Sequence, residues 1–413
     1  MQQAKALDVD FKQAGSLGNE LLERIDRLRE AEPVYWSELN QCWIISGHAE
    51  VAEALRGELP FSNRRAQRAF KILSPEEQLT RVPYLLETFP QWLIDLDPPA
   101  QTRMRRLMMK AFSRKIAEDL RPYAREVIKT KLDLAGQLGE VDMVNEITRP
   151  IAAHTIFRLL GLDPELITTR LPGWMGKVSQ ALGGFAQTPE LLEDTERTLL
   201  DMRGVFAAEI ENRRVSPRDD FISALVTAQE GDDALTDEEV LAICYLTLLA
   251  GIDTTAGTMA MGAAALAELP EAADHIRDVP DAILDHLMEL QRYIAMSTMQ
   301  PRTIGRDFEW RGHQLRQGQV ATIFLAGANR DPKVFPEPDQ LKFDRPQEGN
   351  MTFGPGLHFC IGHLLAKMQL TEFFPELLRR FDMEVLDQRL DFTPALAFRG
   401  LKSLRIRVHP RAG

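Results

Sequence analysis

Cysteine is scarce in this sequence, and its scarcity excludes several classes of protein. The 413 residues include only Cys42, Cys244 and Cys360, which are widely separated along the chain. Three scattered cysteines are too few for a disulfide framework or a zinc ribbon. They favour a reducing compartment, so we expect a cytoplasmic protein.

An excess of positive charge and an apolar N-terminal segment are also lacking. Lys and Arg total 49 against 61 Asp and Glu, which gives a net charge of −12. Sequence-independent nucleic-acid binding requires a basic surface, so no nucleic-acid partner is expected. The first residues, MQQAKALDVDFKQ, contain no apolar core. We therefore expect neither a signal peptide nor an N-terminal membrane anchor.

Long apolar runs are rare, and the one at 241–266 is interrupted by a charge. Asp253 lies in its middle, and a carboxylate at the centre of a bilayer is costly. We therefore expect a buried helix in the core of a soluble protein, with no membrane partner. Thr236 and Glu239 have the spacing of a capping box, which predicts the start of this helix.

Helical periodicity dominates the middle of the chain. Residues 103–112 and 116–134 have helical spacing, and Pro122 is expected to break the second of these helices. A further helix is expected over about 188–213. The segment before it, 171–187, is rich in glycine and is expected to form a mobile loop or lid.

Strand-like segments are few and lie near both ends of the chain. We found no repeat, low-complexity tract or linker that would separate the sequence into parts. We therefore expect one domain over 1–413, mainly α with a small β portion. The β portion is expected at about 30–60 and 301–330 plus 385–410.

The most specific pattern surrounds the last cysteine, in the string FGPGLHFCIG at 353–362. A lone cysteine is most often a small core residue. Here, however, glycines flank Cys360, and a helix is expected directly after it. Backbone N–H groups at a helix start stabilise a thiolate. Without a second cysteine nearby, such a thiolate suits one axial position on a haem iron better than a zinc site.

These ten residues resemble the FxxGxxxCxG signature of the cytochrome P450 haem-thiolate monooxygenases. The resemblance continues in ELQR at 289–292, similar to the family's ExxR, and in AGIDTT at 250–255, similar to AGxDTT. The string DPPAQTRMR at 97–105 is similar to the bacterial DPPEHTRLR segment. The resemblance implies the triangular-prism cytochrome P450 fold, a b-type haem, and insertion of one atom of O2 into a substrate.

The resemblance also implies which residues hold the haem. Cys360 matches the axial iron ligand. The two anionic propionates need cations or hydrogen-bond donors, and the matching positions are Gln101, Arg105, Arg302 and His358. Gln101 departs from the family pattern, in which histidine is commoner, because glutamine donates a hydrogen bond without adding a charge.

Two further groups of residues match motif positions of the family. Asp253 and Thr254 match the acid–alcohol pair that delivers protons during oxygen activation, and such a pair favours O2 over peroxide as the oxidant. A threonine alone could instead bond to the preceding helical turn. Glu289 and Arg292 lie three residues apart on one helix face and can pair. With Arg345, they are expected to brace the fold without contacting substrate.

The pocket implied by the resemblance is mostly apolar with a few hydroxyls. Such a pocket predicts a hydrophobic substrate, such as a terpenoid, steroid, fatty-acid derivative or polyketide. Any one of the lining residues, taken alone, is also consistent with core packing. The expected lining residues are Leu246, Leu249, Ala250, Ser297, Thr298, Ala397 and Phe398.

A basic cluster stands out in this acidic chain. It is either a solvated helix face or a docking surface for an acidic electron carrier, since complementary charge speeds encounter. The sequence contains no flavin, nicotinamide or ferredoxin fingerprint, so electrons are expected from a separate ferredoxin-type donor with its reductase. The cluster comprises Arg103, Arg105, Arg106, Lys110, Arg114 and Lys115.

Two other functions fit parts of the pattern. A non-catalytic haem-thiolate ligand sensor would bind without turnover, although the acid–alcohol pair and the basic cluster argue against it. A hydrolase with Cys360 as nucleophile and His358 as base lacks an evident carboxylate to orient the histidine. Oxygen insertion is therefore the favoured function.

Overall fold

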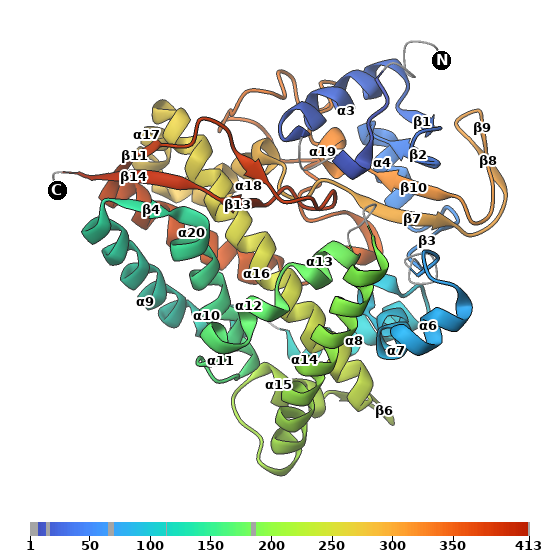
Figure 1. Ribbon diagram of the computed structural model, residues 1–413. Coiled ribbons are helices and arrows are strands. Elements are labelled where there is room, and N and C mark those ends of the chain that lie inside the picture. Colours follow the sequence, from blue (N-terminus) through green and yellow to red (C-terminus); the bar gives the residue numbers. More distant parts are fainter. Residues whose placement is uncertain (1–6, 14–16, 65–69, 113, 183–186, 412–413) are drawn as a thin grey trace. The chain divides into compact units, whose positions relative to one another are not determined.

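Helices make up most of the computed structural model, which describes residues 7–13, 17–64, 70–112, 114–182 and 187–411. The mainly α fold with a small β portion is thereby confirmed. Contacts divide the chain into two units, whose elements are labelled in Figure 1. Unit 1 comprises Met1–Phe61, Arg121–Ala152 and Asp253–Gly413, and unit 2 comprises Ser62–Leu120 and Ala153–Ile252. The single domain expected over 1–413 stays a prediction.

The principal sheet of unit 1 joins strands from both ends of the sequence. Its order is β1 (Val34–Ser37), β2 (Cys42–Ile45), β10 (Val320–Ile323), β7 (Gln300–Ile304) and β3 (Phe61–Ser62). β2 pairs antiparallel with β1 and parallel with β10, with Cys42 opposite Val320. Every residue of β2 and β10 is buried, which explains why both strands are rich in apolar and β-branched residues.

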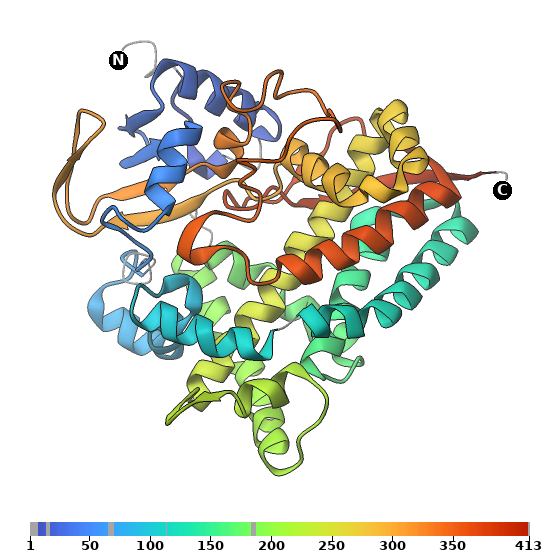
Figure 2. The ribbon, with the colours of Figure 1, turned by 180° about the vertical axis from the view of Figure 1, so that it is seen from behind.

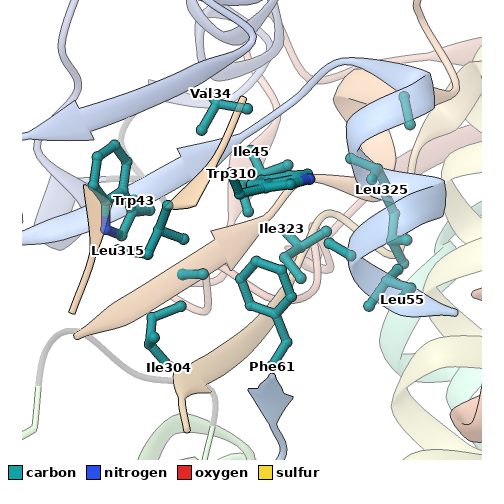
Figure 3. Packing of buried hydrophobic residues seen from close by; sticks show 14 of the residues in the cluster. Val34, Trp43, Ile45, Leu55, Phe61, Ile304, Trp310, Leu315, Ile323 and Leu325 are labelled. Carbon is teal, nitrogen blue, oxygen red and sulfur yellow. The ribbon is translucent and has the colours of Figure 1, made fainter. Parts of the chain in front are cut away.

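Side chains from this sheet and its neighbours form one hydrophobic cluster (Figure 3). The rings of Phe61 and Trp310 meet edge to face with their centroids 5.6 Å apart, a geometry that the ring quadrupoles favour. Leu55, at the end of α4 (His48–Leu55), packs into the same cluster. Ile304 belongs to it as well, so the cluster anchors β7, the strand that contains Arg302.

Smaller sheets and several helices complete unit 1. Three strands pair in the order β11–β14–β4, β12 pairs with β13, and β8 pairs with β9. The strands are β4 (Glu140–Asp142), β8 (Phe308–Trp310), β9 (His313–Leu315), β11 (Phe381–Val385), β12 (Asp391–Phe392), β13 (Leu401–Ser403) and β14 (Arg405–Pro410). The helices are η1 (Phe11–Gln13), α3 (Glu20–Ala31), the π-helix η4 (Met143–Thr148), α17 (Pro270–Asp278), η5 (Pro280–Ala282), α18 (Ile283–Ile294), α19 (Leu325–Ala328), η6 (Gly356–His358) and α20 (His363–Arg380).

Unit 2 consists of helices and one short hairpin, β5 (Gln229–Glu230) with β6 (Asp233–Ala234). Its helices are α6 (Pro75–Arg81), α7 (Pro83–Thr88), η2 (Phe89–Gln91), η3 (Leu93–Asp95), α8 (Ala100–Ala111), α11 (Leu166–Thr169), α12 (Leu171–Trp174), α13 (Lys177–Leu182), α14 (Pro189–Val215) and α15 (Phe221–Val226). Three helices contain residues of both units, namely α9 (Arg114–Leu138), α10 (Arg149–Leu160) and α16 (Asp237–Glu268).

The expected break at Pro122 is wrong, because α9 continues through this residue. Pro122 itself is exposed, whereas Ala124, Ile128 and Leu132 form a buried stripe at helical spacing. A proline inside a helix costs about 3 kcal/mol. Ala117 and Leu120 are buried before Pro122 as well, so apolar packing on both sides of this residue offsets the cost and keeps the helix continuous.

The segment 171–187 is more ordered than the irregular loop expected from its glycines. Its described part forms the short helices α12 and α13, and the side chains of Leu171 and Trp174 are buried. The indole nitrogen of Trp174 donates a hydrogen bond to Asp201 (2.7 Å). Residues 183–186 lie outside the described part, so the mobility expected for a lid stays a prediction.

α16 is the long helix expected from the apolar run. The hydroxyl of Thr236 accepts a hydrogen bond from the N–H of Glu239 (3.2 Å), and the Glu239 carboxylate accepts one from the N–H of Thr236 (2.9 Å). These two bonds confirm the capping box. By length and composition α16 could cross a membrane, but 67% of its most apolar window is buried inside the protein. Such burial is typical of a core helix.

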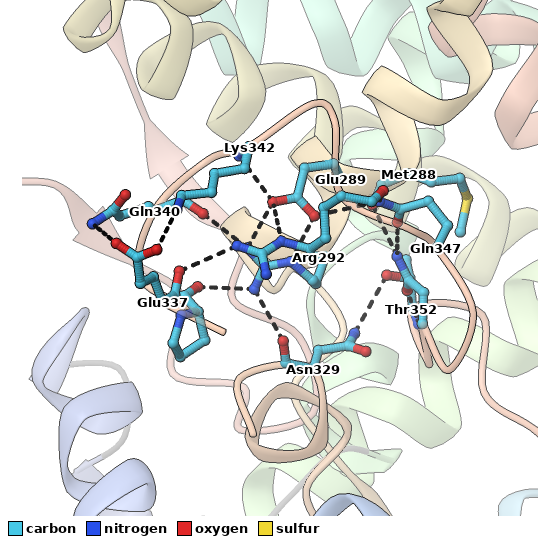
Figure 4. A network of polar contacts seen from close by, with 12 residues as sticks. Met288, Glu289, Arg292, Asn329, Glu337, Gln340, Lys342, Gln347 and Thr352 are labelled. Carbon is cyan, nitrogen blue, oxygen red and sulfur yellow. Dashed lines mark hydrogen bonds and ion pairs between the residues drawn. The ribbon is translucent and has the colours of Figure 1, made fainter. Parts of the chain in front are cut away.

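A buried ionic cluster in unit 1 joins α18 to a long irregular segment (Figure 4). The guanidinium of Arg292 donates to both carboxylate oxygens of Glu289, at 2.8 and 2.9 Å, and both side chains have no exposed surface. Arg345 donates to the same carboxylate (3.2 Å). One carboxylate therefore receives hydrogen bonds from two buried cations.

The same two arginines hold the backbone of the segment 329–355, throughout which the structure contains no helix or strand. Arg292 donates to the carbonyl oxygens of Asn329, Pro338 and Gln340, and Arg345 donates to those of Pro336 and Glu337. A segment without regular structure must satisfy its buried carbonyl groups in other ways. The arginines supply those donors and thereby shape the chain that leads to Cys360.

Replacing Glu289 by alanine should lower the free energy of unfolding by about 3–5 kcal/mol, because two buried guanidinium groups would lose their carboxylate. Glu20→Ala is the matched control, since Glu20 pairs with Arg24 on an exposed helix face and should contribute less than about 1 kcal/mol. Urea unfolding followed by circular dichroism measures both variants. Equal midpoints for the two would show that the buried cluster does not stabilise the fold.

Candidate active site

The loop that contains Cys360 has a backbone that only glycine permits at one position. Gly356 has a φ of +78°, and a Cβ there would lie 2.0 Å from the carbonyl oxygen of Leu55. The N–H of Cys360 donates to the carbonyl oxygen of Phe353 (2.9 Å), which closes the loop. Nδ1 of His363, at the start of α20, donates to the carbonyl oxygen of Cys360 (2.9 Å). Figure 2 shows this orange-red loop leading into α20.

The three cysteines lie in different environments. Cys42 and Cys244 are fully buried, whereas Cys360 is half-buried. Burial raises the pKa of the Cys244 thiol well above its usual value, so this group stays a neutral thiol. Cys360 instead precedes the N-terminus of an 18-residue helix, whose dipole favours a thiolate. The expected role of Cys360 as the iron ligand stays a prediction.

The side chain of Gln300 connects Arg302 to this loop. It is buried, and its guanidinium donates to Oε1 of Gln300 (2.8 Å) and to the carbonyl oxygen of Pro301 (2.9 Å). The amide nitrogen of Gln300 lies 2.8 Å from the point where a Cβ of Gly354 would stand. Within unit 1, the structure therefore brings the expected propionate ligand Arg302 close to the cysteine loop, which also contains His358.

One face of α16 is accessible although most of the helix is buried. Leu248 and Ile252 are buried, whereas Ala250 is exposed and Asp253 and Thr254 are half-buried. Leu246 is also half-buried and lies one turn before Ala250, so these accessible residues follow one side of the helix. Leu249, expected to line the pocket, is buried. An acid and an alcohol thus share an accessible face with apolar side chains.

Small residues on α16 let another helix of unit 2 approach closely. A Cβ on Gly251 would lie 2.5 Å from the Cδ1 atom of Ile156 in α10. A larger residue at this position would require the Ile156 side chain to move. One turn after Thr254, the hydroxyl of Thr258 donates to the Thr254 carbonyl oxygen (2.8 Å), a bond that belongs to the helix itself.

Asp253 has a cationic neighbour that the sequence did not indicate. Nε of Arg149, the first residue of α10, lies 3.9 Å from Oδ1 of Asp253. About a third of the Arg149 side chain and a quarter of the Asp253 side chain are exposed. The two residues are far apart in the sequence and share no motif, so no signal in the chain pointed to their proximity.

Four of the expected pocket residues meet in unit 1. Ser297 forms an isolated β-bridge with Phe398, and the N–H of Thr298 donates to the carbonyl oxygen of Ala397 (3.0 Å). Thr298 is fully buried, and its hydroxyl has no hydrogen-bond partner among the described residues. A buried hydroxyl left without a partner is available to a ligand.

In unit 2, the two other expected cofactor-binding residues lie on one face of α8. Gln101 is buried and Arg105 is half-buried, and residues four apart in a helix are neighbours on its surface. The face therefore offers one neutral and one charged donor. Their expected role in binding propionates stays a prediction, as do the roles of the other expected site residues.

The basic cluster, whose members lie on α8 and at the start of α9, is partly neutralised by acidic residues of unit 2. The guanidinium of Arg103 donates to Asp233, in the β5–β6 hairpin, and to Glu239. The hydrogen bonds to Asp233 and then to Glu239 raise the pKa of Arg103. The ammonium of Lys110 donates to the carbonyl oxygen of Gln229 (2.9 Å). Arg103 therefore serves the structure of unit 2 rather than an open cationic surface.

Comparison with known proteins identifies the family. The family model described as Cytochrome P450 matches residues 140–400. The chain is 30% identical to the 6-deoxyerythronolide B hydroxylase of Saccharopolyspora erythraea, with 76% of each chain covered. It is 26% identical to the polyketide biosynthesis cytochrome P450 PksS of Bacillus subtilis, covering 92% of this chain and 94% of that one.

A solved structure agrees with this assignment over nearly the whole chain. P450BioI, in complex with an acyl carrier protein ligated to hexadec-9Z-enoic acid, matches with a TM-score of 0.87 and 26% identity. The match covers 96% of this chain and 100% of that one. The chain therefore belongs to the cytochrome P450 family and is a haem-dependent monooxygenase.

Proposed function

We propose that this protein inserts one oxygen atom from O2 into a hydrophobic small molecule, by hydroxylation or epoxidation. The proposed cofactor is haem b, and the proposed electron source is a separate ferredoxin-type donor with its reductase. The observation that carries the proposal is the accessible face of α16, where Asp253 and Thr254 lie beside Ala250 and Leu246. Such a face combines apolar contact with a supply of protons. The scarcity of cysteine supports a cytoplasmic location.

The residues present fit a haem. Cys360 would bind its iron through Sγ, since this thiol lies on a glycine-shaped loop before a helix N-terminus. Arg302, His358, Gln101 and Arg105 are the proposed hydrogen-bond donors to the propionates. When bound, the haem supplies the reductive activation of dioxygen, which side chains alone do not perform.

Side chains of α16 would hold and transfer the protons that the reaction needs. Oγ1 of Thr254 both donates and accepts, so it can hold a water molecule in one orientation. The carboxylate of Asp253 is partly exposed and can exchange protons with solvent. A proton passed from the Asp253 carboxyl to the Thr254 hydroxyl would be delivered on the same face of α16 as the apolar side chains.

Removing the hydroxyl should uncouple the enzyme without emptying its pocket. Thr254→Ala is expected to bind haem and substrate and to consume reductant, but to divert most of that reductant to hydrogen peroxide. Asp253→Asn should instead slow oxygen consumption, because its side chain no longer titrates. The measurement is product formed per reductant consumed, with peroxide assayed alongside.

Thr258→Ala is the matched control, since the Thr258 hydroxyl bonds within the helix to a backbone carbonyl. It should keep the coupling of the wild type. Wild-type coupling in Thr254→Ala would reject the acid–alcohol assignment. Reversible spectral changes with ligands but no product in the wild type would favour the non-catalytic sensor.

The proposed iron ligand has an optical test. The reduced carbon monoxide complex should show the red-shifted Soret band of thiolate ligation, because a thiolate donates electron density to the iron. Cys360→Ser should lose this band. Cys244→Ser should keep it, since burial maintains Cys244 as a neutral thiol. Retention of the band in Cys360→Ser would mean that another residue binds the iron.

The relatives narrow the proposed substrate class. One relative is named for hydroxylation of 6-deoxyerythronolide B and another for polyketide biosynthesis, and the solved structure holds hexadec-9Z-enoic acid ligated to an acyl carrier protein. We therefore place polyketides and fatty-acid derivatives ahead of terpenoids and steroids. Optical titration with each class, free and attached to a carrier protein, would rank them.

The proposed docking surface for the electron donor is the exposed part of the basic cluster. Arg106, Lys110 and Arg114 are exposed, and Met109 beside them is 40% exposed. An apolar contact with surrounding positive charge suits an acidic protein partner. Arg103 is left out because its charge is compensated by Asp233 and Glu239.

Reversing the charge of Arg106 and Arg114 to glutamate should slow reduction by a ferredoxin and leave substrate binding unchanged. Higher salt should slow reduction of the wild type through screening. Lys129→Glu, on the exposed face of α9, controls for a charge reversal outside the cluster. If the stopped-flow rates of reduction are unchanged by the two charge reversals and by salt, the cluster is only a solvated helix face.

A further inference from the structure

Arg399, which directly follows the expected pocket residue Phe398, is a buried cation of unit 1. The residue is only 5% exposed, and no carboxylate among the described residues pairs with it. Burial, followed by the nearby charge of Arg330, lowers the pKa of Arg399 to about 10, so the guanidinium is still charged at neutral pH. Burying a charge is costly unless the charged group is well bonded. The other contacts of this guanidinium must therefore offset that cost.

The guanidinium of Arg399 connects segments that are far apart in the sequence. Nη1 donates to the carbonyl oxygen of Ile294 (2.9 Å), the last residue of α18, and Nη2 donates to Oδ1 of Asn19, directly before α3. The guanidinium carbon lies 4.9 Å from the centre of the Phe392 ring in β12, within the range of a cation–π contact. One side chain therefore links the end of α18, the start of α3 and the β12–β13 hairpin.

Two backbone segments that contain expected pocket residues meet beside Arg399. The N–H of Arg399 donates to the carbonyl oxygen of Met296 (2.9 Å), and the N–H of Thr298 donates to that of Ala397 (3.0 Å). This pairing is an isolated bridge rather than a pair of strands, and so short a contact is weak by itself. The bond from the Arg399 side chain to Ile294 adds a third link between the two segments.

The segment after α18 depends on such a link because its turn is unfavourable. Ala295 has a φ of +49°, a left-handed conformation that surrounding contacts must hold in a residue other than glycine. The next residue, Met296, lies against α16, since a Cβ on Gly257 would be 2.5 Å from the Cε atom of Met296. Gly257 follows Thr254 by three residues, so the two are neighbours on the helix surface. The segment that Arg399 holds therefore packs on α16 close to Thr254.

We propose that Arg399 is a positioning residue that fixes one wall of the substrate pocket beside Thr254. This wall comprises Ser297, Thr298, Ala397 and Phe398. Without the guanidinium, its two segments would keep only their short backbone pairing and would shift, and a substrate would lose apolar contacts with them. This inference rests on the proposed function, in which these residues line the pocket. It adds to that function a residue outside the pocket lining that acts through its neighbours.

Two azoles of different size probe this wall in the haem-loaded protein. Imidazole and 4-phenylimidazole both bind a haem iron through a ring nitrogen, but the phenyl group also needs apolar contact with the pocket. Optical titration gives the dissociation constant of each azole, and the measured quantity is the ratio of the two constants. Since one methylene changes discrimination by about 10- to 200-fold, Arg399→Met should weaken 4-phenylimidazole relative to imidazole by about tenfold.

Two further variants and a control sharpen the test. Asn19→Ala removes one acceptor and leaves the guanidinium in place, so it should shift the ratio in the same direction by a smaller factor. It decides the question if Arg399→Met does not fold. Arg399→Lys keeps the charge but lacks the planar fork that reaches two acceptors, so it should recover part of the loss. Lys402→Met, in an exposed ion pair with Asp391 of the same hairpin, should keep the wild-type ratio.

The outcomes separate this inference from the proposed function. Phe398→Ala removes part of the wall itself and should shift the ratio whether or not Arg399 positions it. A shifted ratio in Phe398→Ala with wild-type ratios in Arg399→Met and Asn19→Ala would overturn the role of Arg399 and leave the proposed pocket intact. If the thermal midpoints of those two variants fall as well, Arg399 is only a brace for the fold. Wild-type ratios in all three would reject the proposed pocket, and this inference with it.

Discussion

The carboxylate of Glu289 is the group on which the arrangement of unit 1 depends most. It is fully buried and receives hydrogen bonds from Arg292 and Arg345, which in turn hold five backbone carbonyl groups of the segment 329–355. A buried charge is tolerated only when its partners are complete. Loss of one member would leave the others uncompensated, so the cluster acts as a unit that shapes the chain before Cys360.

α16 meets two conflicting demands along one helix. Most of its surface must be apolar to pack in the core, and Gly251 removes a Cβ so that Ile156 can approach. Its accessible side must offer polar groups, and Asp253 and Thr254 supply them there. A charge in such a helix is costly without a counter-ion. Arg149 provides one at 3.9 Å, which reduces the cost without removing the polar groups from the accessible face.

The basic cluster on α8 and at the start of α9 illustrates how charge in a sequence differs from charge on a surface. By sequence alone, its six members were equivalent cations. The β5–β6 hairpin and the start of α16 bring Asp233 and Glu239 to Arg103 and compensate its charge. Arg106 and Arg114 stay exposed. Any docking surface is therefore smaller than the run of basic residues indicates.

The sequence by itself determined what depends on local order and composition. These features are the mainly α fold, the capping box of Thr236 and Glu239, and the family signature around Cys360. Helix periodicity, capping and short motifs act over a few residues, so the sequence shows them directly.

The tertiary structure decided which distant residues meet: Arg149 with Asp253, Gln300 with the cysteine loop, and Arg103 with the hairpin. It also kept α9 continuous through Pro122, because the packing of a long buried stripe outweighs one lost backbone hydrogen bond. Such contacts depend on how helices and loops pack across long sequence separations, and no local pattern encodes them.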